Sequence, residues 1–254
     1  HQLMSSQVDV DRLDYLRRDC FYTGVTEGSV NTERLISMLN VADDKIVVEA
    51  KGIYSVEKFL VARRLMYWQV YLHKTVLGAE YLLIQILKRA KAVKHLNLPM
   101  PSVLKPFIET ENFNSQKSLI NQYAQLDDYD VMAAIKEWQH SSDKVLSNLC
   151  QRLLNRKLLG VEIASTEISN ERLQTLRIKT GQLLGLSADE ASYLVFSVAI
   201  SNNAYNPQRD RINLLYKDGS LVDIAQAADQ LNLSALSQPV TKYFLFAPKI
   251  VLEA

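Results

Sequence analysis

A charged segment between Ser5 and Asp19, with one tyrosine inside it, constrains the fold of this chain more than any other stretch. It holds four aspartates and three arginines, yet its residues repeat with helical spacing. At about 3.6 residues per turn, Asp11, Tyr15 and Asp19 fall on one face of the predicted helix. Two carboxylates on either side of an aromatic ring do not suit a hydrophobic core. They suit the wall of a site for a polar ligand or a metal.

The same spacing also fits a solvated helix surface. Arg12 lies beside Asp11 and Arg18 beside Asp19. Aspartate and arginine residues three or four positions apart form exposed pairs that contribute only a few tenths of a kcal/mol. Spacing alone favours this second interpretation. Tyr15 argues against it, because a tyrosine has no evident reason to lie in the middle of a solvated face.

A second polar stripe lies on a long helix that we expect between residues 55 and 95. Arg63, Tyr67, Tyr71 and Lys74 are spaced by four, four and three positions, so they project to one side. Cations and aromatic rings on one stripe suit an anionic ligand that also carries a sugar or a base. An amphipathic helix with tyrosine hydroxyls at the water boundary would give the same stripe. Two such stripes in one chain favour the ligand site, and we expect both to face a common cleft.

The composition is that of an ordinary globular protein. Hydrophobic residues make up 48% and charged residues 22% of the chain, and the net charge is +1. This balance predicts a real core and gives no basic field that would attract nucleic acid. The two cysteines, Cys20 and Cys150, argue against a disulfide framework and suit buried free thiols in a cytoplasmic protein. No apolar run is long enough to span a membrane.

Apolar spacing, glycines and prolines divide the chain into helices, with strands mainly in its last third. The helices are expected at 8–22, from a cap at Asn31 or Thr32, from a cap at Ser55 to 95, and at 102–108, 115–124, 129–139, 143–156 and 171–184. The strands are expected at 46–49, 160–164, 193–201, 212–216, 220–222 and 242–247, with turns at Asp43-Asp44 and Asp218-Gly219. We therefore predict a mainly α fold, in which a helical part over 1–157 precedes a small α+β subdomain over 158–254 with a short antiparallel sheet.

The sequence lacks a complete set of catalytic groups. None of its four histidines has metal-ligand spacing to another, and it contains no Cys-x-x-Cys pair. Glycine-rich phosphate loops and the Gly-x-Ser-x-Gly motif are also missing. The residues therefore offer half a site, with anion contacts and carboxylates but without a catalytic residue or a full metal cage.

Several segments resemble one enzyme family in the right order. The segment 5–19 resembles the closing metal-ligand helix of HD-superfamily phosphohydrolases, above all the deoxynucleoside triphosphate triphosphohydrolases related to the SAM-and-HD-domain enzyme. Further similar segments are Thr23-Gly24-Val25 and residues 57–67, 70–74, 126–130 and 155–159. The resemblance covers residues 5–159 in recognisable order and the remainder more loosely.

The resemblance implies a site for a nucleotide and a divalent metal. The family holds its metal with a His, a His-Asp pair and a later Asp, and the resemblance places that later Asp at Asp11. It implies phosphate contacts from Arg12 and Arg63, with Tyr67 close to the phosphates. It does not distinguish Mn, Mg, Fe, Ni or Zn.

The sugar contacts also follow from the resemblance. Asp19 would hold the 3′-hydroxyl, and Tyr15 and Tyr71 would pack on the sugar. Tyr71 would lie close enough to disfavour a 2′-hydroxyl. The chain would accordingly bind a deoxynucleotide.

Regulation and assembly are implied less directly. Arg34 and Lys74 match positions that contact a regulatory nucleotide at a subunit interface in regulated members, which implies a homo-oligomer. Gly160 stands where those members carry a lysine, and Asn31 stands where they carry an aspartate. Both differences put activation by a nucleotide in doubt.

The upstream half of the family's metal site is missing from this chain, because no His-Asp pair precedes Asp11. We therefore expect the chain to be the C-terminal part of a cytoplasmic metal-dependent dNTP triphosphohydrolase, inactive by itself and without catalytic residues of its own. The alternative is a non-catalytic module for nucleotide sensing or assembly. Single-stranded nucleic-acid binding would suit the arginines and tyrosines, but the neutral net charge weighs against it.

Overall fold

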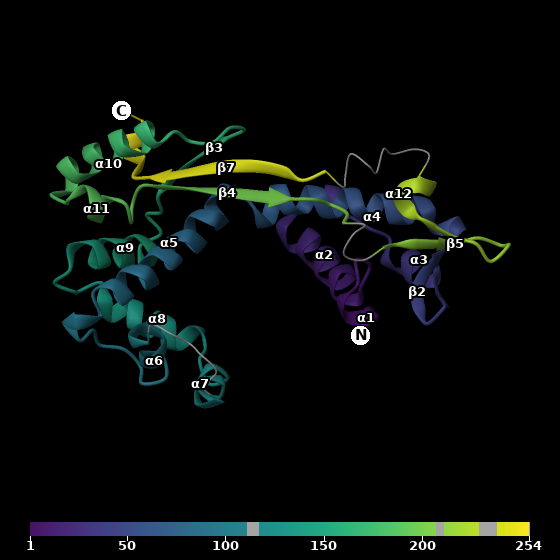
Figure 1. The fold of residues 1–254 in the computed structure, drawn as a ribbon, viewed down its shortest axis with the longest axis horizontal. Helices are drawn as coiled ribbons and strands as arrows, with labels where there is room; N and C mark the ends of the chain where they lie inside the picture. The colour runs from purple at the N-terminus through teal and green to yellow at the C-terminus, as the bar shows by residue number, and fades with distance from the viewer. Residues whose placement is uncertain (111–116, 207–210, 229–237, 254) are drawn as a thin grey trace. The chain divides into compact units, whose positions relative to one another are not determined.

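The computed structural model describes residues 1–110, 117–206, 211–228 and 238–253 (Figure 1). The chain divides into two compact units. The first unit comprises residues 1–73 and 200–241, and the second comprises residues 74–199 and 242–254. Each is described by itself below.

Short helices surround two longer ones in the first unit. Its helical elements are α1 (Gln2–Ser5), α2 (Val10–Thr23), η1 (Thr26–Gly28), α3 (Thr32–Ser37), η2 (Ala50–Gly52), α4 (Ile53–Met66), the π-helical turn η3 (Tyr67–Tyr71) and α12 (Ile224–Ala227). The Asp9 side chain caps the start of α2, and Gly24 ends it in the left-handed conformation with φ 71°. Asn31 caps α3 through the main-chain N–H of Arg34, as the sequence predicts.

A four-stranded sheet completes the first unit. Its strands are β1 (Leu39–Ala42), β2 (Lys45–Glu49), β5 (Asn213–Leu215) and β6 (Leu221–Asp223), in the order β1-β2-β5-β6. β2 and β5 pair in parallel, with Val48 opposite Leu214, whereas the two outer pairs are antiparallel. The parallel pair joins segments that lie more than 160 residues apart in sequence.

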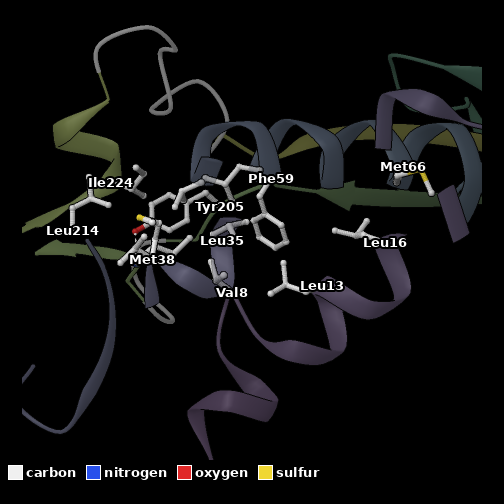
Figure 2. Packing of buried hydrophobic residues seen from close by; sticks show 14 residues of the cluster. Val8, Leu13, Leu16, Leu35, Met38, Phe59, Met66, Tyr205, Leu214 and Ile224 are labelled. Atoms are coloured by element: carbon white, nitrogen blue, oxygen red, sulfur yellow. Dashed lines mark hydrogen bonds between the residues drawn. The ribbon is translucent and has the colours of Figure 1, made fainter. Parts of the chain in front are cut away.

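One hydrophobic cluster holds the helices and the sheet of this unit together (Figure 2). Phe59 of α4 and Leu16 of α2 are almost fully buried in it. Tyr205 and Leu214 join them from the later segment, and both are buried completely. The opening helix and residues beyond 200 therefore share a single core.

The second unit consists of a helical part and a three-stranded sheet. Its helical elements are α5 (Lys74–Ala92), η4 (Lys94–Leu96), α6 (Lys105–Glu109), α7 (Lys117–Tyr123), α8 (Asp128–Trp138), α9 (Lys144–Leu154), α10 (Asn170–Leu184), α11 (Ala188–Ala191) and α14 (Lys249–Leu252). The sheet has the order β3-β7-β4, from β3 (Gly160–Ala164), β7 (Val240–Ala247) and β4 (Phe196–Asn202). The first residues of β7 and the last of β4 belong to the first unit.

An arginine is fully partnered between α5 and α9 in the second unit. Arg89 donates from Nε and Nη2 to the two carboxylate oxygens of Asp143, at 3.0 and 2.6 Å. Its guanidinium also lies over the ring of Tyr193, and Glu190 is 3.6 Å away. Asp143 caps α9 by accepting the N–H of Leu146. This network ties the start of α9 to the last turn of α5.

The prediction of a mainly α protein with a short antiparallel sheet is confirmed. Most predicted helices and strands exist within a few residues of their expected bounds. The structure divides the chain differently from the boundary we expected after residue 157. The reason is that residues 213–223 pair with β2 and pack into the core of the first unit.

The expected helix over 55–95 is wrong in two respects. It begins at Ile53 after Gly52, without a side-chain cap from Ser55. It also ends at Tyr71, after a π-helical turn in which the N–H of Leu72 bonds the carbonyl of Tyr67, five residues back, at 2.7 Å. α5 then begins anew at Lys74. Strand β1 was missed, although the expected turn at Asp43-Asp44 joins it to β2.

Candidate substrate-binding site

The start of α2 holds a cation in place. Arg12 donates from Nη1 to the main-chain carbonyl of Ser6 and to the carboxylate of Asp9. Asp9 is only 3% exposed, and it also accepts the main-chain N–H of Arg12 at 2.7 Å. Because one carboxylate both caps the helix and binds the guanidinium, the position of Arg12 is fixed to the helix N-terminus.

A second guanidinium, that of Arg63 on α4, is partly buried with two of its three nitrogens unused in hydrogen bonding. Its Nε and Nη1 atoms are shielded from solvent and have no hydrogen-bond partner among the described residues. Its Cζ atom lies 6.0 Å from the ring centre of Tyr67. Burial, and after it the positive charge of Arg12, lower the pKa of Arg63. A shielded cation with unused donors beside another cation costs stability in the absence of a ligand. The same arrangement suits the binding of an anion.

Three tyrosine rings lie next to these cations. The ring of Tyr71 meets that of Tyr15 edge to face at 5.9 Å and that of Tyr67 at 5.3 Å. Burial and the neighbouring Tyr67 raise the pKa of Tyr15 to about 12, against the opposing effect of Arg63 and Arg12. Tyr15 therefore keeps its hydroxyl proton at neutral pH and can donate a hydrogen bond.

A hydrogen bond links the two predicted stripes. The hydroxyl of Tyr71 donates to Oδ2 of Asp19 at 2.8 Å. Burial, followed by this bond, raises the pKa of Tyr71 well above its usual range. The structure thus brings Tyr15 and Asp19 of α2 against the tyrosines that follow α4. Another aspartate on this helix, Asp14, forms an exposed pair with Arg18, as the surface interpretation predicts.

The π-helical turn decides how the tyrosines are presented. Tyr67 and Tyr71 begin and end η3, where each turn of backbone takes one residue more than in an α-helix. Such turns are rare and are frequently found at functional sites. The periodicity of the sequence carries no sign of this turn, because the apolar pattern continues on both sides of it.

Asp11 lies in the first turn of α2 and is exposed. Its carboxylate has no ion pair or side-chain hydrogen bond within the described part of the chain. Among the described residues, no group of three His, Cys, Asp or Glu side chains is placed to hold a metal ion. The residues present therefore do not fit a complete metal site, and Asp11 offers one free ligand at most.

The two remaining predicted residues belong to different units. Arg34 is exposed on α3 of the first unit. Lys74 opens α5 in the second unit and lines a cavity of about 460 Å³ there. Arg156 and Lys249 bring further cations to this cavity, and Glu162 and Glu253 bring two carboxylates. Its lining also includes Gly160.

Two functional candidates were missed by the sequence analysis. Asp9 rather than Asp11 is the carboxylate that binds Arg12, and the only sign of it was its position just before the predicted helix. Gln7 is buried next to this site, and no motif marks it. The two free cysteines agree with expectation for Cys150, which is buried, while Cys20 is half-buried.

Similar proteins point to one family. Residues 30–98 match the family described as the HD associated region. A phosphohydrolase from Bacteroides thetaiotaomicron, solved by crystallography, has 46% identity and a TM-score of 0.89, over 98% of this chain and 63% of its own. The uncharacterized protein YwfO of Bacillus subtilis is 31% identical over 97% of this chain and 57% of its own length.

A shorter match names an activity. The deoxynucleoside triphosphate triphosphohydrolase SAMHD1 homolog of Dictyostelium discoideum is 33% identical over 31% of this chain and 15% of its own length. The chain spans roughly three fifths of the two longer matches, which cover nearly all of it. In the described parts of the chain, no helix has both the length and the apolar character needed to cross a bilayer.

Proposed function

Because this chain belongs to the HD superfamily of phosphohydrolases, we propose that it supplies the phosphate-binding and sugar-binding part of a dNTP triphosphohydrolase. The hydrolysis would join a water oxygen to the α-phosphorus, break the bond to the 5′-oxygen of the nucleoside and release triphosphate. The 5′-oxygen would take up a proton. The proposal concerns a protein of the relatives' length, of which these residues form one portion.

The partly buried guanidinium of Arg63 carries this proposal. Its shielded Nε and Nη1 donors have no hydrogen-bond partner among the described residues, and burial followed by the charge of Arg12 lowers its pKa. A phosphate chain would satisfy both cations at once, because each phosphate offers several charged acceptor oxygens. The same cations would offset the charge that gathers on those oxygens in the transition state.

The sugar of the nucleotide would lie against the tyrosines. Asp19 and the Tyr71 hydroxyl already form a polar pair at 2.8 Å, and a sugar hydroxyl could join it. The edge-to-face rings of Tyr15 and Tyr71 offer an apolar surface next to that pair. We propose that Tyr71 fills the space that a 2′-hydroxyl would need, and that Tyr67 lies beside the phosphates.

A divalent metal enters the proposal only through Asp11. Bound to a phosphohydrolase, such an ion acidifies water and neutralises phosphate charge. Asp11 is free to serve as one ligand, and the other ligands would come from parts of the protein that this chain does not include. We therefore expect the chain alone to show no turnover.

Titration calorimetry with inorganic triphosphate tests the central contact. The variant Arg63→Gln should weaken binding by about tenfold or more, the loss expected for a charged hydrogen-bond partner. Arg64→Gln is the matched control, since it removes a neighbouring arginine of the same helix and should bind as the unaltered chain does. Equal binding by both variants would exclude Arg63 as a phosphate ligand.

Hydrolysis of dNTPs tests the proposed role of Asp11 as a metal ligand. In a protein that includes the upstream region, Asp11→Asn should abolish release of triphosphate from dNTPs. The control is Asp14→Asn, which removes only a surface ion pair. A phosphate-release assay with added pyrophosphatase reports the turnover. Unchanged rates for Asp11→Asn would show that Asp11 is not a metal ligand. Turnover by the isolated chain with Mn²⁺ or Mg²⁺ would contradict the proposal that its active site is incomplete.

A second candidate function, nucleotide sensing, is favoured by the cavity of about 460 Å³ in the second unit. We propose that Lys74, Arg156 and Lys249 bind the phosphates of a regulatory nucleotide there, and that Arg34 contributes from another subunit of a homo-oligomer. Lys74→Ala should weaken nucleoside triphosphate binding in calorimetry. Lys157→Ala, outside the cavity, should not. Sedimentation with and without nucleotide tests the assembly.

A further inference from the structure

The side chain of Gln7 makes a two-point contact with a distant segment of the chain. Its Nε2 atom donates to the carbonyl of Asn206 at 2.8 Å, and its Oε1 atom accepts the N–H of Asn206 at 3.1 Å. Gln7 is only 7% exposed. A side-chain amide that pairs with both main-chain groups of one residue copies the pairing of neighbouring β-strands, and it fixes direction as well as distance.

This contact lies one peptide bond away from the residue that holds Arg12. The carbonyl of Ser6, which accepts the Arg12 guanidinium, belongs to the peptide unit whose N–H is that of Gln7. On the other side, Val8 is buried in the core of the first unit and Asp9 caps α2. The segment from Ser6 to Asp9 is therefore held at every residue by a contact that the structure describes.

Little slack remains around this segment. The cavity lined by Gln2, Ser6 and Gln7, among others, measures only about 20 Å³, which is room for a single water molecule. A shift of the Ser6 carbonyl would thus need the bonds of Gln7 to break first. The buried, two-point geometry makes that costly, because both the amide and the main-chain groups of Asn206 would lose partners.

We propose that Gln7 is a positioning residue for Arg12. By pairing with Asn206 it holds the Ser6 carbonyl at the place where that carbonyl orients the Arg12 guanidinium toward the phosphates. The inference rests on the proposed function in one respect, namely that Arg12 binds phosphate. It assigns a role in substrate binding to Asn206, which directly follows the core residue Tyr205.

The first test is a double-mutant cycle with inorganic triphosphate as the titrant, on the complete chain. Gln7→Ala should weaken binding by about three- to tenfold, the range expected when one charged contact is displaced. In an Arg12→Ala background the same change should have no effect, because the contact it serves is gone. An equal loss in both backgrounds, or no loss in either, would overturn the proposal.

The matched control is Gln2→Ala. The Oε1 atom of Gln2 accepts the N–H of Ile46 at 2.7 Å, so Gln2 also anchors the opening segment through a main-chain bond. Its link to Ser6 is a main-chain bond, in which the Gln2 carbonyl accepts the N–H of Ser6 at 3.1 Å, and the substitution keeps that carbonyl. Gln2→Ala should leave triphosphate binding unchanged. Gln7→Glu keeps the acceptor for the N–H of Asn206 but loses the donor, so its triphosphate affinity should lie between those of Gln2→Ala and Gln7→Ala.

A second readout separates this inference from the proposed function. The NMR signals of the Arg12 guanidinium report whether its rotation is restricted, with no ligand present. Gln7→Ala should release that restriction and Gln2→Ala should not. If Gln7→Ala leaves the Arg12 signals unchanged, the positioning role is excluded. If it changes them but neither Arg12→Ala nor Arg63→Gln affects triphosphate binding, the proposed function fails while the positioning contact stands.

Discussion

Each unit of the protein contains a shielded arginine, and the two arginines have opposite surroundings. Arg89 in the second unit has a bidentate carboxylate, a second carboxylate at 3.6 Å and an aromatic face. Arg63 in the first unit has an aromatic ring and a nearby cation, while its Nε and Nη1 atoms lack partners among the described residues. Partner geometry, rather than burial, therefore distinguishes a structural arginine from one that awaits a ligand.

The pKa directions express the same difference. Hydrogen bonding to Asp143 raises the pKa of Arg89, whereas burial lowers the pKa of Arg63. Burial makes the charged form of Arg63 less favourable in the absence of a ligand. A bound anion would stabilise that charge, and this stabilisation would add to the affinity for the anion. Arg63 on α4 gives the first unit such a site. In the second unit, Arg89 and Asp143 pair with each other and link α5 to α9.

The largest expected effect is on the paired arginine. Arg89→Met leaves Asp143 shielded from solvent without its cation, since the two side chains are only 14% and 11% exposed. The free energy of unfolding, measured by chemical denaturation, should fall by about 3–5 kcal/mol. Arg172→Met, which breaks the exposed pair with Glu162, is the control and should change stability by less than about 1 kcal/mol.

The unpaired arginine should respond in the opposite way. Arg63→Met removes a buried charge without a partner, so the free energy of unfolding should stay the same or rise by about 1 kcal/mol. Triphosphate affinity should fall by about tenfold or more. If Arg63→Met destabilises the protein as much as Arg89→Met does, the distinction between the two arginines is lost.

The bond between the two stripes should contribute less. Tyr71→Phe removes the hydroxyl that donates to Asp19 and should lower the free energy of unfolding by about 1–2 kcal/mol. Thermal or chemical unfolding reports the change. Tyr22→Phe alters a tyrosine that is 79% exposed and should have no effect, so equal losses in both variants would deny the bond a structural role.

The smallest expected effect is a pH dependence of stability that comes from Asp143, the partner of Arg89. Burial alone would raise the pKa of Asp143, but the hydrogen bonds from Arg89 and from Leu146 outweigh it and the net pKa is lowered. A carboxylate with a lowered folded-state pKa contributes stability that is complete above its unfolded pKa, about 3.9. That stability is lost as pH falls further toward the folded-state pKa.

Unfolding at several pH values below about 5 measures this contribution. Asp143→Asn should flatten the loss of stability in acid, whereas Asp14→Asn, at an exposed pair, should leave the slope unchanged. An acid slope that survives in Asp143→Asn would place the responsible carboxylate elsewhere.

Local structure was largely predictable from the sequence. The end of α2 at Gly24, the cap at Asn31 and the turn at Gly219 each follow from one residue's backbone preference or side-chain acceptor. The stripe spacing also indicated which faces of the two helices would meet, and the bond between Tyr71 and Asp19 joins them.

Features that depend on distant partners were not predictable. The parallel pairing of Val48 with Leu214 leaves no local signature, because a strand of either orientation has the same period. The π turn at Tyr67–Tyr71 arises within an unbroken helical pattern. The choice of Asp9 over Asp11 as the partner of Arg12 depends on which carboxylate the core buries, and spacing does not reveal that.

The parallel pair of β2 and β5 has a consequence for how the chain acquires its structure. During synthesis, β2 leaves the ribosome long before β5, and the whole sequence of residues 74–199 appears between them. Closing so long an intervening stretch delays the nucleus of the first unit, so its buried cluster stays open until residues 200–224 arrive. The residues assigned to the nucleotide thus gain their complete packing only after residues 200–224 have been made, although they all lie before residue 74.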